Sequence, residues 1–216
     1  MNKKQRAKEV VKILTKKYPQ AKTELEWNIK YPYQLVVAVM LSAQATDVGV
    51  NKATKELFKK YNTPKSFAEA KYEDLISYTK SINYYKTKTQ RIINNAQALM
   101  LEFAGKIPKT LKDLIKLPGI GRKSANVILQ EIYGIGESIV VDTHMTRVTN
   151  RLKLQPYNSQ KYAEKIEQEL SKIVEKINYT EFSRTIVLHG RYTCKAKKPE
   201  CLKCELNHIC PSAFKV

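Results

Sequence analysis

A tight hairpin between two helical patterns is predicted at Leu117-Pro118-Gly119-Ile120-Gly121-Arg122-Lys123-Ser124. Pro118 ends the first helix, and the two glycines permit a turn with positive φ. The first N–H groups of the helix after Gly121, together with the helix dipole, form a site for phosphate. A dinucleotide-binding loop needs a preceding strand and a third glycine, and a P-loop needs glycine directly before lysine, so neither fits. The remaining alternative is an ordinary helix–turn–helix corner.

The hydrophobic pattern outside the hairpin is helical almost throughout. Tyr33 to Ala43 are apolar nearly all round, which predicts a buried central helix. Ser66 and Glu69 have the spacing of a capping box, which predicts a helix start at that point. Further helices are expected over residues 3–17, 110–116, 143–151, 159–176 and 180–192. Since the two-residue alternation of strands is missing, the predicted fold class is all-α.

The charge balance is strongly basic. Lys and Arg total 39 against 20 for Asp and Glu, a formal net charge of +19 over 216 residues. Apolar residues make up 43%, which excludes a disordered tail. Residues 84–123 carry nine basic and two acidic side chains, a local net charge of +7. A folded protein with this charge repels itself, so a polyanionic partner is the first hypothesis and a merely solvated basic surface is the alternative.

All four cysteines lie near the C-terminus, in the pattern Cys194-x6-Cys201-x2-Cys204-x5-Cys210. A terminal cluster of this density is typical of metal binding and not of a disulfide framework. Four thiolates can close around one tetrahedral zinc ion or one cubane iron–sulfur cluster, and the single close pair slightly favours the cluster. His208 lies inside this segment and is expected to face solvent, because four sulfurs already complete a site.

The sequence gives no sign of a membrane-spanning segment, and a membrane-surface role for the basic N-terminal helix is an alternative that no other feature supports. The longest apolar run, from Leu35 to Leu41, is too short to span a bilayer. The basic start Met1-Asn2-Lys3-Lys4-Gln5-Arg6 leads into an amphipathic pattern and not into the apolar core of a signal peptide. We therefore expect a cytoplasmic protein.

Three separated motifs occur in one order: the hairpin, then Val141-Asp142-Thr143-His144, then the four cysteines. Together they resemble the endonuclease III family of helix-hairpin-helix DNA glycosylases. The resemblance runs from Leu41-Ser42-Ala43-Gln44-Ala45-Thr46-Asp47 to Cys210, nearly the whole chain. It implies a six-helix barrel over residues 22–135 and a second lobe made of residues 1–21 and 136–216. It also implies that Cys194, Cys201, Cys204 and Cys210 hold a [4Fe-4S] cluster.

The resemblance implies a nucleoid-associated enzyme of base excision repair that acts as a monomer on double-stranded DNA with damaged pyrimidines or abasic sites. Such an enzyme removes oxidised pyrimidines and then cleaves the abasic site by β-elimination, which requires an amine to form a Schiff base with the sugar. Lys123 matches the family's nucleophile, and its alternative role is one more phosphate contact. Asp142 matches the catalytic aspartate, and its alternative role is a plain helix N-cap, although both roles can hold together.

The resemblance also implies a set of DNA contacts. Gln44 matches the residue that fills the gap left by an extruded base, and its alternative role is a surface amide at a helix end. Ile82 matches a residue of the loop that wedges the opposite strand. Tyr84 is assigned to the same loop by inference, because family members often have Gly and Leu in place of Asn83 and Tyr84. The remaining contacts are expected at phosphates, from the hairpin and from a basic loop between the first two cysteines: Gly119, Gly121, Arg122, Lys195, Lys197 and Lys198. A solvated charge run is the alternative for the three lysines.

Two other functions compete with this one. The first is a monofunctional adenine or thymine mismatch glycosylase on the same scaffold, which lacks the nucleophilic lysine. The second is a non-catalytic helix-hairpin-helix module that binds DNA through its phosphates. Lys123 counts against the first alternative.

Overall fold

The computed structural model describes residues 1–215, and no β-strand occurs within that range. The prediction of an all-α fold is confirmed. No helix in these residues is both long enough and apolar enough to cross a bilayer. The chain divides into two compact units, one of Thr23–Tyr133 and one of Met1–Lys22 with Gly134–Val216.

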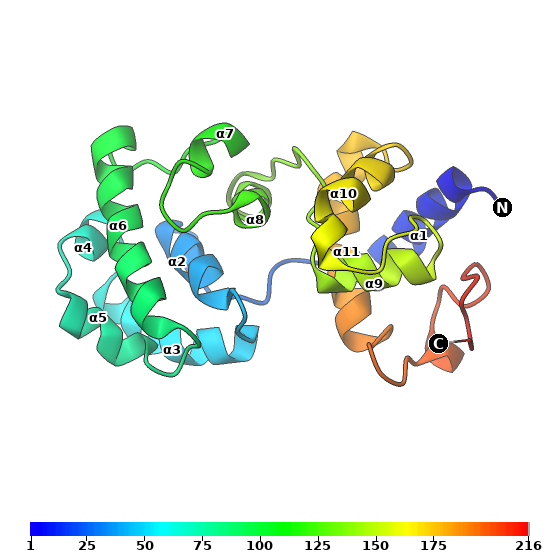
Figure 1. Cartoon of the computed structure of the whole chain (residues 1–216), viewed down its shortest axis with the longest axis horizontal. Coiled ribbons are helices and arrows are strands. Elements are labelled where there is room, and N and C mark those ends of the chain that lie inside the picture. Colours follow the sequence, from blue (N-terminus) through cyan, green and yellow to red (C-terminus); the bar gives the residue numbers. More distant parts are fainter. Residues whose placement is uncertain (216) are drawn as a thin grey trace. The chain divides into compact units, whose positions relative to one another are not determined.

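The unit of residues 23–133 is built around α2 (Tyr33–Ser42), in which every residue from Tyr33 to Leu41 is buried. Helix α2 packs against α3, α6 and α8, and α6 packs in turn against α4 and α5 (Figure 1). Each buried aliphatic side chain contributes about 1.5–3 kcal/mol of transfer free energy, so the apolar run at 35–41 anchors this unit. The other helices are α3 (Asp47–Lys60), α4 (Pro64–Ala68), α5 (Tyr72–Thr79), α6 (Tyr85–Phe103), α7 (Leu111–Leu114) and α8 (Arg122–Tyr133).

The other unit joins the N-terminal helix α1 (Lys3–Lys17) to the C-terminal part of the chain (Figure 1). Val10 and Leu14 of α1 share one hydrophobic core with Val148, Phe182 and Ile186. Helix α11 (Tyr179–Tyr192) packs against both α1 and α9 (Thr143–Arg151). The remaining elements are α10 (Ala163–Ser171) and the 3-10 helices η1 (Gln160–Tyr162), η2 (Lys176–Asn178) and η3 (Cys201–Lys203).

Two helix boundaries differ from the sequence prediction. The capping box that begins α4 is formed by Thr63 and Ser66, and Glu69 instead ends the helix. Pro64 occupies the first helical position, where its fixed φ favours a helix start, so Thr63 is the better cap. The helix expected over 159–176 is α-helical only over Ala163–Ser171, after a 3-10 turn capped by Ser159.

Candidate functional site

The hairpin between α7 and α8 depends on glycine at position 119. Gly119 has a φ of +81°, and a Cβ atom there would lie 2.7 Å from Cε of Met40 and 3.4 Å from Cβ of Arg91. The left-handed backbone therefore favours glycine, and a Cβ would also displace the methyl end of the Met40 side chain. At Gly121 the surroundings are open, since a Cβ would meet nothing within 4 Å. Gly121 directly precedes α8 and so leaves the first amides of that helix uncovered by a side chain.

A hydrogen bond from a buried side-chain amide holds the backbone of the hairpin. Asn95 of α6 is fully buried, and its Nδ2 donates to the backbone carbonyl of Pro118 over 2.8 Å. Its Oδ1 accepts a hydrogen bond from the hydroxyl of Tyr33 over 2.9 Å. Burial raises the pKa of Tyr33, which keeps this phenol protonated as the donor. Asn95 was not predicted as a site residue from the sequence, although it is a polar residue on the apolar stripe formed by Ile92, Ala96 and Leu99.

Lys123 is the second residue of α8, and its side chain is exposed, as is that of Arg122. The opposite face of the helix is anchored in the core by Ala125, Ile128 and Leu129. The amide of Ala125 donates to the carbonyl of Gly121 over 2.9 Å, so the helix starts immediately behind the hairpin. The fold therefore presents an amine and a guanidinium to solvent beside the predicted phosphate site.

Asp142 is the N-cap of α9 and is half-buried. Its Oδ1 accepts a hydrogen bond from the backbone N–H of Met145 over 2.7 Å. The plain N-cap role that was considered for Asp142 is therefore present, and it fixes the direction of the carboxylate. Lys123 and Asp142 belong to different compact units.

The structure brings the turn that carries Gln44 next to the loop at 81–84. The side-chain Nδ2 of Asn83 donates to the carbonyl of Gln44 over 3.0 Å. Gln44 is exposed and has a left-handed backbone with a φ of 55°. The two segments line a pocket of about 470 Å³, formed by Gln44, Ala45, Thr46, Gly49, Ser81, Ile82 and Asn83.

The two candidate wedge residues differ sharply in exposure. Ile82 is only 4% exposed, so its side chain belongs to the core of its own unit. Tyr84 is 68% exposed and has a left-handed backbone with a φ of 59°. Tyr84 therefore presents a large aromatic side chain to solvent at a strained backbone position, whereas the side chain of Ile82 is buried.

The four cysteines line one pocket, together with apolar side chains that include Val148, Leu152 and Leu206. All four are half-buried and form no disulfide. Burial raises the pKa of Cys204 to about 11 and also raises the pKa of Cys210. Within residues 1–215, no three His, Cys, Asp or Glu side chains converge closely enough to hold a single metal ion. A cubane cluster makes a different demand, because each thiolate binds its own iron atom.

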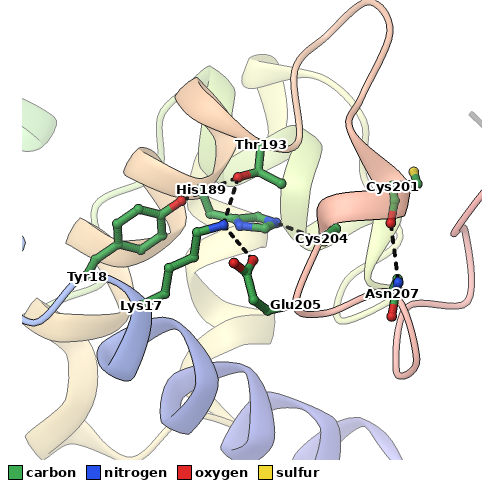
Figure 2. Close-up of polar contacts among 8 residues, drawn as sticks. All are labelled: Lys17, Tyr18, His189, Thr193, Cys201, Cys204, Glu205 and Asn207. Carbon is green, nitrogen blue, oxygen red and sulfur yellow. Dashed lines mark hydrogen bonds and ion pairs between the residues drawn. The ribbon is translucent and has the colours of Figure 1, made fainter.

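The ammonium of Lys17 links α1 to the C-terminal segment that carries the cysteines. Figure 2 shows this ammonium between the hydroxyl of Thr193 and the carboxylate of Glu205, at 3.1 Å and 2.5 Å. Beside it, Nε2 of His189 lies 3.6 Å from Sγ of Cys204 (Figure 2). Burial and the charge of Lys17 lower the pKa of His189 to about 4, so its imidazole is neutral at physiological pH. His208 is exposed, as predicted.

The three lysines of the basic loop have different surroundings. Lys195 forms an ion pair with Glu200 over 2.5 Å, which partly neutralises its charge. Lys197 and Lys198 are exposed, and Lys198 has a φ of 51°. Arg151 of α9 holds this loop by donating to the carbonyls of Lys195 and Ala196 over 2.7 Å and 3.1 Å.

Comparison with known proteins gives matches over the whole chain. Residues 37–176 match the family model of the HhH-GPD superfamily of base excision DNA repair proteins. Endonuclease III of Escherichia coli (strain K12) is 40% identical over 216 residues, which cover 100% of this chain and 99% of that protein. Endonuclease III of Rickettsia prowazekii (strain Madrid E) is 42% identical over 201 residues, covering 93% and 92%.

Solved structures agree with these matches. A trapped covalent intermediate of endonuclease III with DNA, an estranged-adenine complex, has a TM-score of 0.89 at 36% identity and covers 99% of this chain and 98% of that one. A thermostable thymine-DNA glycosylase has a TM-score of 0.81 at 19% identity, which shows a shared fold alone. Since the family model spans more than half of the chain and the relatives are about 40% identical over nearly all of it, this protein belongs to the endonuclease III family of HhH-GPD base excision DNA repair proteins.

Proposed function

We propose that this protein excises oxidised pyrimidines from duplex DNA and cleaves the strand at the resulting abasic site, with Lys123 as the nucleophile. The observation that carries the proposal is the position of Lys123: an exposed amine in the first turn of α8, directly behind the glycine hairpin. This lysine matches the nucleophile of the family. A covalent intermediate with DNA has been trapped for a structurally similar endonuclease III, which supports a covalent route.

In the first step, the neutral amine of Lys123 attacks C1′ of the damaged nucleotide. The bond between C1′ and the base breaks, and the base leaves with the electron pair and takes up a proton. Loss of a proton from nitrogen and opening of the sugar ring give an imine between Nζ and C1′.

In the second step, a proton leaves C2′ and the bond from C3′ to the 3′ phosphate oxygen breaks. The imine accepts the electrons as the C2′ proton departs, which is why an amine nucleophile is needed for elimination. Water then hydrolyses the imine, which frees Lys123 and leaves an unsaturated aldehyde at the cleaved 3′ end.

Asp142 is proposed to stabilise the positive charge that develops on the sugar as the base departs. Its carboxylate is held in one direction by the hydrogen bond from the amide of Met145. A fixed charge of this kind costs little reorganisation during the reaction, and such preorganised groups contribute about 10²–10³ in rate when tested by substitution. The capping bond and the catalytic role use the same side chain.

The target base must leave the stack before C1′ can react, so a side chain must fill the space that the base leaves in the duplex. We assign the filling of this gap to Gln44 and the wedging of the opposite strand to Tyr84. Ile82 is left out of this assignment because its side chain is buried in its own unit. Phosphate binding is assigned to the amides behind Gly119 and Gly121, to Arg122, and to Lys197 and Lys198 of the basic loop.

We also propose that Cys194, Cys201, Cys204 and Cys210 hold a [4Fe-4S] cluster. The residues fit such a group: the four thiols line one pocket, and burial there disfavours a thiolate unless a metal neutralises it. Nε2 of His189 lies within reach to donate to a coordinated Cys204 sulfur. When bound, the cluster supplies a cross-link between four thiolates, and the chain's own contribution is a rigid loop that carries Lys197 and Lys198.

The proposed function is tested with a labelled duplex that contains one oxidised pyrimidine. We expect strand cleavage without any alkali treatment, because the chain itself performs the elimination. A monofunctional glycosylase cleaves this duplex only after alkali, and a non-catalytic module leaves it intact. Cleavage that requires alkali, or activity confined to an adenine mispair, would contradict the proposal.

A further inference from the structure

A buried lysine joins the two loops to which the DNA contacts of the first unit have been assigned. Lys88 of α6 is only 7% exposed, and its Nζ donates to the backbone carbonyls of Leu41 and Ala43 over 2.7 Å and 2.6 Å. Burial lowers the pKa of Lys88. Taking an ammonium out of water is costly unless close acceptors replace the lost solvent, and these two carbonyls do so.

The two acceptors lie where α2 ends and the turn to α3 begins. Helix α2 ends at Ser42, so the carbonyls around it lack partners from a further helical turn. The C-terminus of a helix carries a partial negative charge, which a cation complements. Ala43 is directly followed by Gln44, whose φ of 55° needs support from its surroundings because the side chain disfavours that backbone.

The main chain of the same lysine reaches the second loop. The backbone N–H of Lys88 donates to the carbonyl of Tyr84 over 3.0 Å, and this bond begins α6. Tyr84 is also in the left-handed region, with a φ of 59°. Asn83 adds a second bond between the two loops, because its side-chain Nδ2 donates to the carbonyl of Gln44 over 3.0 Å. Lys88 therefore bonds to the residue before Gln44 with its side chain and to Tyr84 with its backbone.

We infer that Lys88 is a positioning residue that holds the Gln44 turn and the Tyr84 loop at a fixed separation before DNA binds. This inference rests on the proposed roles of Gln44 and Tyr84. Because both loops are already ordered, Gln44 and Tyr84 enter the duplex without a further entropy cost for ordering them. The fixed separation therefore favours extrusion of the base. The inference explains why an ammonium is buried at this point, since its three N–H donors can satisfy the carbonyls of both Leu41 and Ala43.

The test compares two reactions that share the chemistry but differ in the need for base extrusion. Lys88→Met should slow excision of an oxidised pyrimidine on the order of ten- to hundredfold, as expected for a misplaced positioning group. Elimination at a preformed abasic site should change much less, because no base has to leave the stack. Lys86→Met is the matched control: Lys86 is exposed on the same helix, and its loss should leave both rates unchanged. A variant that slows both reactions equally would overturn the positioning role.

A double-mutant cycle separates this inference from the proposed function. If Lys88 acts through Gln44, the variant with Gln44→Ala and Lys88→Met should be no slower in excision than the slower single variant. Independent effects that multiply would overturn the inference. If Gln44→Ala alone leaves excision unchanged, the proposed role of Gln44 fails, and the inference fails with it. If Lys88→Met excises the base at the unchanged rate while Gln44→Ala is slow, the inference about Lys88 fails and the proposed role of Gln44 stands.

A second variant covers the case in which Lys88→Met does not fold, which thermal unfolding would show. Asn83→Ala removes the other bond between the loops and leaves the buried ammonium in place. It should slow excision more than elimination, in the same direction but to a smaller extent, because one of several bonds is lost. Equal rates for Asn83→Ala and the unchanged protein in both reactions would overturn the inference.

Discussion

Arg151 donates a hydrogen bond from its guanidinium to Sγ of Cys194 over 3.4 Å, and the same nitrogen donates to the carbonyl of Lys195 over 2.7 Å. Arg151 is the last residue of α9, the helix that Asp142 caps at its other end. A second arginine of that helix, Arg147, donates to the carbonyls of Gly190 and Cys194. One helix therefore carries the proposed catalytic aspartate and braces the first cysteine and the basic loop.

Replacing Arg151 should loosen the basic loop. In Arg151→Met the carbonyls of Lys195 and Ala196 lose their charged donor. We therefore expect weaker DNA binding and faster loss in air of the absorption of the proposed iron–sulfur cluster. Hydrogen bonds to charged groups contribute about 1.5–3 kcal/mol each, so their removal should have a measurable effect. The decay of the absorption over time measures the loss of the cluster. Lys165→Met, which removes an exposed positive charge from α10, is the control. Equal loss rates in the two variants would contradict a bracing role.

The exposed lysines of the basic loop should dominate its share of salt-dependent binding. The slope of log K against log salt changes by about 0.9 for each phosphate contact removed. The variant with Lys197→Ala and Lys198→Ala should therefore reduce the magnitude of this slope by up to the amount expected for two phosphate contacts. Titration of a duplex at several salt concentrations measures the slope. Lys195→Ala should change it less, because Lys195 is already paired with Glu200. An unchanged slope in the double variant would show that the loop does not bind DNA.

The two hairpin glycines should respond differently to alanine. Gly119→Ala should lower stability by about 1–3 kcal/mol, since it places a side chain on a left-handed backbone and against Met40. Gly121→Ala meets nothing within 4 Å and should stay within about 0.5 kcal/mol of the unchanged protein. Chemical unfolding of both variants, followed by circular dichroism, gives the comparison. Similar stability losses in the two variants would contradict the specific need for glycine at position 119.

Substitution of Asp142 can separate its charge from its cap. Asparagine caps helices as well as aspartate does, so Asp142→Asn should keep the bond to the amide of Met145 and the melting temperature. Excision should slow by about 10²–10³ if the carboxylate stabilises charge in the transition state. Asp142→Ala should lose both the rate and part of the stability. An excision rate in Asp142→Asn that falls only as far as DNA binding falls would leave Asp142 as a cap alone.

The sequence predicts the elements of this fold well because its decisive signals are local. The glycine hairpin, the cap at Asp142 and the buried helix from Tyr33 depend on residues within a few positions of one another. The start of α4 was misplaced because Thr63-Pro64 competes with Ser66 as a cap, and the proline decides the outcome.

The contacts that hold the candidate site together could not be predicted in this way. Asn95, Lys88 and Arg151 act on carbonyls 23, 45 and 44 positions away in the sequence. Nothing in the neighbouring residues marks those partners, because chain folding alone brings them together. The same holds for Ile82, whose burial depends on the packing of the whole unit, and for Lys195, whose charge is paired with Glu200.

The nucleophile is tested most directly by borohydride trapping on a duplex that contains one abasic site, followed by peptide mapping of the adduct. Borohydride reduces the imine between the amine and C1′ to a stable bond, so the reacting residue is identified. We predict an adduct on Lys123 in the unchanged protein and in the control Lys116→Gln, which removes an exposed lysine of the same region. Lys123→Gln should give no adduct while it retains most of its DNA affinity. An adduct that persists in Lys123→Gln, or one that maps to another lysine in the unchanged protein, would contradict the account.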